Sequence, residues 1–229
     1  MIGIIGAMQS EINGLKDAIR DLRTERYGGF EFAIGHIGNH EVAVVRAGVG
    51  KVNAAVCAQT LILRYQPEII INSGVAGSLS PKLNILDVAV ATDAVQHDYD
   101  TTALGEPLGA LTLGDDLVRA LPCDAAWRER LLRAAEIVGV RAIPARIASG
   151  DRFVTSKEEK KRIVDNFQAD ACEMEGAAIV QTCYLSGVPC AVLRAISDST
   201  DDCHHMEYTT FLPKAVEQLN AILFQLLSE

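Results

Sequence analysis

The sequence predicts one α/β domain in which helices flank a mostly buried, mixed β-sheet. Short apolar runs alternate along the chain with longer segments of helical spacing, which is the pattern of strands joined by helices. The chain has 229 residues, and 49% of them are hydrophobic, which is enough for one large core. No linker, repeat or low-complexity segment interrupts it. We therefore expect a single domain over residues 1–229.

Each expected element has a local signal. The apolar run at 2–8 predicts a buried strand, and Ser10 is the expected N-cap of a helix that continues to Leu22. The pair Gly38-Asn39 is expected to turn a hairpin. The other expected elements are strands at 30–38, 40–48, 68–77, 87–95, 140–150 and 189–197, and helices at 51–65, about 125–138, after an entry segment at 171–174, and at 207–228. Residues 107–114 are the best candidate for a mobile loop.

Charge and composition exclude several classes of partner. The formal net charge is -9 and no run of Lys and Arg is present, so we expect no nucleic acid. No apolar stretch approaches the roughly 20 residues that a membrane span needs, and the N-terminus does not resemble a signal peptide. The six cysteines form no C-x-x-C pair and are expected to be buried thiols. These features predict a cytoplasmic protein that binds a small ligand.

Polar residues follow four of the expected strands, at the edge where open α/β sheets bind ligands. Glu11 follows the first strand, although an acid in a first helical turn also favours the helix dipole. Residues 73–78, "SGVAGS", allow backbone amides to face a ligand or simply make a tight turn. Glu173 and Glu175 precede a helix, so one of them has an alternative role as its N-cap. Arg194 and Asp198 flank the last strand end, while Asp201 and Asp202 are expected to be capping or turn residues.

Other motifs fail on inspection. The segment 48–53, "GVGKVN", lacks the first glycine and the Ser or Thr of a phosphate loop, and it lacks the third glycine of a dinucleotide fingerprint. The pairs His97-Asp98 and His204-His205 have no further Cys or His at ligand spacing. We therefore expect no metal and no cofactor.

The acids that remain suit one kind of chemistry. Glu11, Glu175 and Asp198 are expected to meet at one sheet edge, with Arg194 nearby. Glycoside hydrolysis uses such carboxyl groups, because the sugar becomes cationic while one acid protonates the leaving group and another activates water.

Seven segments of the chain resemble those of a known family. The segments "IGIIGAMQSEI", "AGVGKVNAA", "INSGVAGSL", "QHDYDTTALG", "IASGDRFV", "EMEGAAI" and "RAISDSTDD" are similar, in order and spacing, to the 5'-methylthioadenosine/S-adenosylhomocysteine nucleosidases of the purine nucleoside phosphorylase-like superfamily. The resemblance covers nearly the whole chain. It implies a three-layer α/β/α sandwich, a homodimer, and release of adenine in methionine salvage and the methyl cycle.

The resemblance also implies roles for individual residues. Glu11 becomes the base for water with Arg194 beside it, and Asp198 the acid for purine N7, helped by Ser197. Glu175 takes the ribose hydroxyls, and Glu173 is expected to support the site. The remaining implied substrate contacts are Met174 under the sugar, Phe153, Val154, Ala76 and Gly77 around adenine, Met8, Val49 and Tyr208 around the 5' group, and Thr101 and Leu104 from the partner subunit. Val75 and Leu104 depart from several relatives, which have Ser and an aromatic residue there.

Three alternatives remain open. A purine nucleoside phosphorylase is the nearest, but its relatives resemble each other in a Gly-Asp-Pro-x-Arg turn after the first strand, where this chain has "GAMQSE". Glu11 would repel a phosphate dianion, so we expect water as the nucleophile. A nucleoside-binding protein without catalysis and a nicotinamide-dependent enzyme are the others. The sequence does not rank methylthioadenosine, adenosylhomocysteine, 5'-deoxyadenosine and aminodeoxyfutalosine as substrates.

Overall fold

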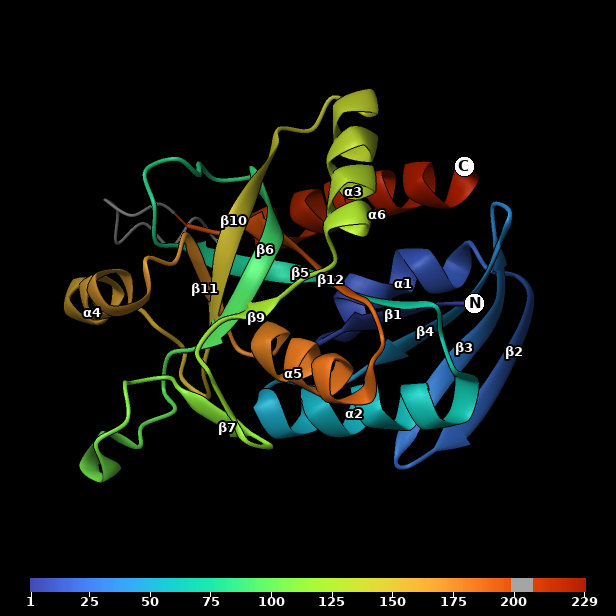
Figure 1. Ribbon diagram of the computed structural model, residues 1–229. Coiled ribbons are helices and arrows are strands. Elements are labelled where there is room, and N and C mark those ends of the chain that lie inside the picture. The colour runs from blue at the N-terminus through green and yellow to red at the C-terminus, as the bar shows by residue number, and fades with distance from the viewer. Residues whose placement is uncertain (199–207) are drawn as a thin grey trace.

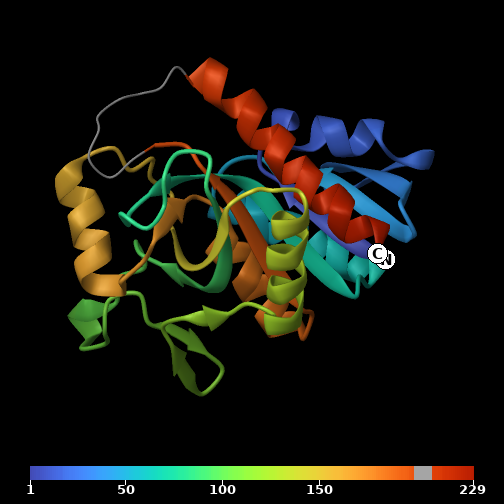
Figure 2. The ribbon, with the colours of Figure 1, turned by 90° about the horizontal axis from the view of Figure 1, so that it is seen from above.

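A mixed sheet lies in the middle of the molecule, between helices on both of its faces (Figure 1). The computed structural model describes residues 1–198 and 208–229, without the side chains of Tyr208 and Thr209. Within these residues the predicted α/β/α layering is confirmed. Figure 2 shows α6 running alongside α1 on one side of the sheet.

The strands pair in the order β11-β10-β6-β12-β5-β1-β4-β3-β2, with β9 beside β6. They are β1 (Ile2–Gly6), β2 (Arg20–Tyr27), β3 (Phe30–Ile37), β4 (His40–Arg46), β5 (Ile69–Ser78), β6 (Val88–Gln96), β9 (Leu121–Pro122), β10 (Ala142–Ser149), β11 (Ala171–Glu173) and β12 (Cys190–Ile196). A separate hairpin consists of β7 (Leu111–Leu113) and β8 (Asp116–Val118). The strands β1, β5 and β12 run parallel, so their carboxyl ends share one edge.

One part of the sheet closes on itself. The short strand β11 pairs in parallel with β10 and, on its other side, antiparallel with β5, where Cys172 lies opposite Gly77. The sequence did not predict this closure, because pairing between distant segments leaves no local signal. It brings the segment that begins with Glu173 next to the carboxyl end of β5.

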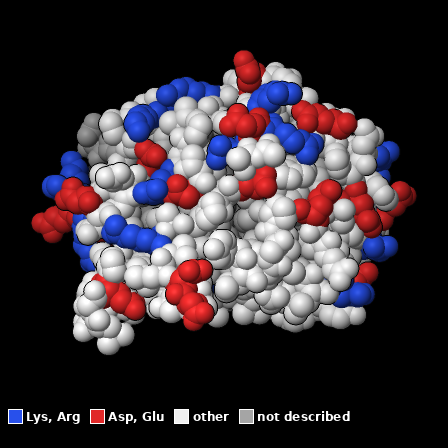
Figure 3. All heavy atoms as spheres, viewed as in Figure 1, with Lys and Arg blue, Asp and Glu red and all other residues white. Residues whose placement is uncertain are grey.

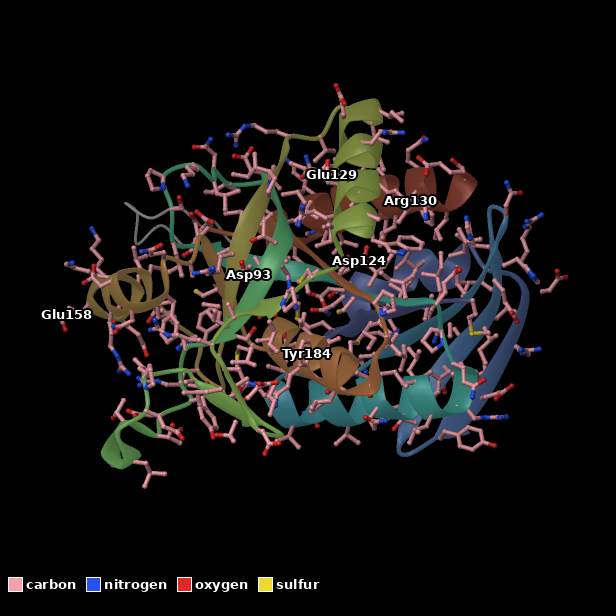
Figure 4. The ribbon with its side chains drawn as sticks, in the orientation of Figure 1. Asp93, Asp124, Glu129, Arg130, Glu158 and Tyr184 are labelled. Atoms are coloured by element: carbon pink, nitrogen blue, oxygen red, sulfur yellow. The ribbon has the colours of Figure 1, made fainter. Side chains whose placement is uncertain are left out.

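Two large hydrophobic cores, one on each face, hold most of the helices to the sheet. On one face α1 (Gln9–Asp17), α3 (Ala125–Ile137) and α6 (Tyr208–Ser228) bury residues such as Leu15, Leu131 and Leu219. On the other face α2 (Lys51–Tyr65) and α5 (Gly176–Ser186) bury Leu61 and Ile179. Asp124, labelled in Figure 4, begins α3 by accepting a hydrogen bond from the Trp127 N–H at 2.9 Å.

The predicted start and end of the first helix are wrong. Its N-cap is Met8 rather than Ser10, and the helix ends at Asp17. Leu22 instead belongs to β2, where it is half exposed. The sequence of β2, RDLRTERY, places charged side chains along the outer strand of the sheet, as edge strands often do to prevent pairing with other chains. Ile19 and Leu22 continued the helical spacing without belonging to the helix.

Two other segments differ from expectation. Residues 107–114 are only partly a loop, because Leu111–Leu113 forms β7. The sequence analysis missed α4 (Lys157–Phe167), which is highly charged and buries only Ile163 and Phe167. Ser156 caps α4 by accepting the Glu159 N–H at 3.1 Å. Ser followed three residues later by Glu is the capping pattern that would have revealed it.

The cysteine and membrane expectations were tested on the described residues. The five cysteines among them are free and buried, and burial raises the pKa of Cys57, Cys123 and Cys172 to about 12. These thiols are therefore not activated nucleophiles. None of the described helices combines the length and apolarity needed to cross a membrane.

The two cores predict how truncation changes stability. Leu15→Ala removes a fully buried side chain between α1 and the sheet, so we expect the free energy of unfolding to fall by about 2–5 kcal/mol. Leu22→Ala is the matched control, because Leu22 is 50% exposed, and it should cost no more than about 0.5 kcal/mol. Urea unfolding followed by circular dichroism measures both. Equal losses in the two variants would contradict this packing.

Candidate active site

Four charged side chains meet where β1, β5, β11 and β12 end. Glu11, Glu173 and Glu175 are between 4% and 9% exposed, and Arg194 is 1% exposed. They come from α1, from β11 and its exit, and from β12. The sequence predicted that Glu11, Glu175 and Asp198 would meet with Arg194 nearby, and gave Glu173 only a supporting place. The structure brings Glu11, Glu173, Glu175 and Arg194 together in the interior rather than on an open edge, while Asp198 is held farther along β5.

Arg194 lies at the centre of this group. It is opposite Gly74 in the β5–β12 pairing, and its Nη2 donates to Asn72 Oδ1 and to Glu173 Oε2. A Cβ at position 74 would collide with Arg194 Nη1 and lie 2.7 Å from Glu11 Oε1. Gly74 is therefore needed for the guanidinium to lie against β5. The sequence had left open whether residues 73–78 face a ligand or make a tight turn; at Gly74 the absent side chain makes room for Arg194.

The carboxylate of Glu11 joins the start of α1 to β5. Its Oε2 accepts the N–H groups of Ala7 at 2.7 Å and Met8 at 2.9 Å, and its Oε1 accepts the Val75 N–H at 3.3 Å. The bond from Met8 caps α1, so the alternative interpretation of Glu11, as an acid in the first turn of a helix, is correct. Burial raises the pKa of Glu11, while Arg194 and the three N–H groups act in the opposite direction. A raised pKa makes a carboxylate a better base.

Glu173, rather than Glu175, caps α5. Glu173 Oε2 accepts the N–H groups of Glu175 at 3.0 Å and Gly176 at 2.7 Å, and its Oε1 accepts the Ser149 hydroxyl. Glu175 occupies the N-cap position but makes no capping bond with its side chain. Instead its Oε1 accepts the Gly50 N–H at 3.0 Å. Burial and the charge of Glu173 raise the pKa of Glu175 to about 7.

Asp198 is anchored farther along β5. Its Oδ1 accepts the Ser78 N–H at 3.1 Å, and Lys160 Nζ lies 2.5 Å from its Oδ2. Ser197 donates its hydroxyl to the Ala76 carbonyl at 3.1 Å. Glu11 and Asp198 thus bind the N–H groups of Val75 and Ser78, which are three residues apart on an extended strand. This spacing separates the two anchors by about 10 Å.

The other predicted contact residues differ in how far they are buried. Met8, Met174, Val154 and Gly77 are half-buried and Ala76 is buried, whereas Val49, Phe153 and Leu104 are exposed. Thr101 donates its hydroxyl to Glu106 at 2.7 Å. The structure does not bring Leu104 to the acids within one chain, since it lies in η1 (Thr102–Leu104) with 79% of its surface exposed. The side chain of Tyr208 lies outside the described part.

The sequence analysis missed three partners of the charged group: Asn72, Ser149 and Lys160. Asn72 also donates to the Ile5 carbonyl at 2.9 Å, and Ser149 accepts the Ala177 N–H at 2.7 Å, so both join separate elements. Polar residues inside the apolar strands "IIINSG" and "RIASG" were the available signal. For Lys160 the sequence offered none, because it is one of several charged residues on α4.

The histidine and aspartate pairs show no metal site where they can be examined. Asp98 accepts from Lys51 Nζ at 2.6 Å and from the Asp151 N–H at 2.8 Å, so it joins the start of α2 to the loop after β10. No cluster of three potential ligands occurs in the described ranges. Asp201, Asp202, His204 and His205 lie outside them.

Comparison with known proteins agrees with this geometry. The family model described as "Phosphorylase superfamily" matches residues 1–228. The chain is 38% identical to the 5'-methylthioadenosine/S-adenosylhomocysteine nucleosidase of Haemophilus ducreyi over 99% of this chain and 97% of that protein. Among solved structures, the Neisseria meningitidis nucleosidase in complex with methylthio-immucillin-A has a TM-score of 0.92 and 32% identity, covering 99% of this chain and 98% of that one.

A second solved structure is similar to the same extent. The futalosine hydrolase of Helicobacter pylori has a TM-score of 0.90 and 36% identity, covering 98% of this chain and 96% of that one. With a family match over residues 1–228 and a nucleosidase relative that is 38% identical over 99% of this chain, the chain belongs to the phosphorylase superfamily and, within it, to the 5'-methylthioadenosine/S-adenosylhomocysteine nucleosidase family.

Proposed function

We propose that this chain hydrolyses the N-glycosidic bond of 5'-methylthioadenosine and S-adenosylhomocysteine, and of 5'-deoxyadenosine, releasing adenine and the 5-substituted ribose. Membership of the nucleosidase family supports the reaction. The observation that carries it is the pair of carboxylates, Glu11 and Asp198, anchored three residues apart along β5. A nucleoside lying along β5 has its glycosidic bond between them.

The chemistry follows from this placement. Glu11 holds the attacking water beside Arg194 and removes its proton, and its raised pKa suits that role. Asp198 gives a proton to adenine N7, so that the base leaves as a neutral molecule. Glu175 binds the ribose hydroxyls, and its carboxylate stabilises the positive charge that develops on the sugar.

Apolar groups complete the substrate site. Met174 supports the sugar, while Phe153 stacks on adenine and the Val154 backbone contacts its edge, with Ala76 and Gly77 on the other side. Met8, Val49 and Tyr208 surround the 5' group. Val75 needs no hydroxyl to serve the site, because its backbone N–H already binds Glu11.

Water rather than phosphate is the nucleophile. The turn after β1 presents the carboxylate of Glu11. The N–H groups of Ala7 and Met8 in this turn already donate to that carboxylate, so they are not available to bind phosphate. A phosphate dianion at this place meets the negative charge of Glu11, and the neighbouring guanidinium of Arg194 is already bonded to Asn72 and Glu173.

We also propose a cytoplasmic homodimer in which Thr101 and Leu104 complete the 5' pocket of the partner. Val52, Val56 and Leu63 form one stripe along α2 and are 49–74% exposed. Tyr184, labelled in Figure 4, and Leu185 extend it onto α5, which packs against α2. The surface over α2 and α5 is almost free of charged side chains in Figure 3. An apolar patch of this kind favours a protein partner.

The test of the reaction is adenine release by the purified protein, with and without phosphate. We expect phosphate-independent release from methylthioadenosine together with methylthioribose. Parallel assays with adenosylhomocysteine, 5'-deoxyadenosine and aminodeoxyfutalosine rank the 5' groups. Release that requires phosphate and yields a ribose 1-phosphate would identify a phosphorylase instead, and binding without release a nucleoside-binding protein.

The two catalytic carboxyls predict a particular kinetic loss. Asp198→Asn and Glu11→Gln keep the size of the side chain but remove proton transfer, so we expect kcat to fall roughly 10²–10⁴-fold with adenine affinity preserved. Steady-state assays and calorimetric titration with adenine measure the two quantities. Asp165→Asn and Glu68→Gln, which change exposed carboxylates that have no predicted place in the site, are the matched controls. A variant that mainly weakens binding would disprove the role given to that residue.

The apolar stripe predicts the oligomeric state. Leu63→Glu places a charge within the proposed interface, so we expect light scattering to show a monomer and kcat/KM for methylthioadenosine to fall. Ile137→Glu changes a residue of similar exposure, 57%, on α3, and should remain a dimer. If the unchanged protein is itself a monomer with full activity, the proposed partner contribution is wrong.

A further inference from the structure

The buried charges of the site are not balanced. Three carboxylates, Glu11, Glu173 and Glu175, surround one guanidinium, and all four side chains are at least nine-tenths buried. If every group is ionised, the net charge is negative by two. Unpaired buried charges are costly, so the protein has to distribute the single positive charge of Arg194 among three acids.

The contacts show which acid receives it. Arg194 Nη2 donates directly to Glu173 Oε2, whereas Glu175 Oε2 is 3.7 Å from the same atom. Glu173 also accepts two backbone N–H groups of α5 and the Ser149 hydroxyl. Glu173 is therefore fully satisfied as an ion, and it points at protein groups rather than at a substrate.

Glu175 has a much poorer environment for its charge. Among the described residues its carboxylate accepts one hydrogen bond, from the Gly50 N–H at the start of α2. The charged groups that face it are Glu173 on β11, Arg194 on β12 and Glu11 on α1, so two acids oppose one base. Burial and Glu173 together raise the pKa of Glu175 to about 7.

We propose that Glu173 is a positioning residue that neutralises Arg194 and caps α5, and thereby leaves Glu175 free to exchange its proton for a cationic sugar. This inference rests on the proposed function, since it assigns a task to a neighbour of the same site. No covalent step is involved; one proton leaves Glu175 for solvent as the cation binds.

The direction of the pH effect follows from linkage. A cationic ligand favours the ionised form of Glu175 and lowers its pKa below about 7, so binding at neutral pH releases protons. Affinity for such a ligand therefore rises with pH up to about 7 and then levels off, once Glu175 is ionised without it.

Glu173→Gln separates charge from hydrogen bonding. The amide oxygen can keep the place of Oε2 and accept the N–H groups of Glu175, Gly176 and Arg194. The NH₂ group then faces Ser149, whose hydroxyl oxygen can accept it. The variant loses one negative charge and leaves Arg194 without its counterion, while the fit is preserved.

The experiment uses an adenine nucleoside analogue with a pyrrolidine amine in place of the sugar, the type bound by the Helicobacter pylori nucleosidase. Calorimetry in buffers of different ionisation enthalpy, between pH 5.5 and 8, gives affinity and proton release. We expect release of about half a proton at pH 7 for the unchanged protein. Glu173→Gln should release much less, shift the pH dependence to lower pH, and bind the amine about tenfold more weakly, but bind adenine normally.

Two further variants make the result decisive. Glu175→Gln should abolish proton release, because it removes the titrating group, and Glu68→Gln on the opposite end of β5 should change nothing. Unaltered proton release in Glu173→Gln, or release that persists in Glu175→Gln, would overturn the inference. A protein that shows these linkages but never releases adenine would refute the proposed function and leave the role of Glu173 intact.

Discussion

The burial of Arg194 among carboxylates is the interaction on which the rest of the site depends. Its guanidinium is 1% exposed and donates to Asn72 and Glu173, so removing the cation leaves three buried carboxylates without a compensating charge. Glu11 and Glu175 are close enough to be influenced by it but are bonded mainly to backbone N–H groups. Arg194 thus forms a direct hydrogen-bonded ion pair with Glu173, whereas Glu11 and Glu175 are held mainly by backbone N–H groups.

The fold makes room for this charge in two ways. Gly74 removes the side chain that would occupy the position of the guanidinium. The pairing of β11 with β5 closes the sheet and delivers Glu173 to the same place from a segment about 100 residues later in the chain. Both features involve the backbone of β5, a buried strand inside the sheet. The helices α1 and α5 begin at two of the carboxylates, Glu11 and Glu173.

The electrostatic character of the site agrees with the proposed chemistry. A site with more buried acids than bases attracts a developing sugar cation and repels phosphate. The charge of Glu173 adds to burial in raising the pKa of Glu175, whereas burial is what raises the pKa of Glu11. The Lys160 ammonium compensates the charge of Asp198 separately, beside Ser78 at the end of β5. The region proposed for adenine and the region proposed for ribose therefore have different local charge.

The sequence by itself determined the alternation of strands and helices, the absence of an intact phosphate-binding loop, and the acids at the strand ends, because apolar periodicity and residue type are local properties. It could not assign Glu173 and Glu175 their separate roles, because two acids two residues apart have the same local signal. Only the structure shows that Glu173 caps the helix and that the side chain of Glu175 does not. It also misplaced Ser10 and Leu22, where the apolar spacing continued past the true helix end. Asn72, Ser149 and Lys160 became partners of the charged group only through tertiary structure, because their contacts join segments distant in the chain and therefore depend on how the strands pair.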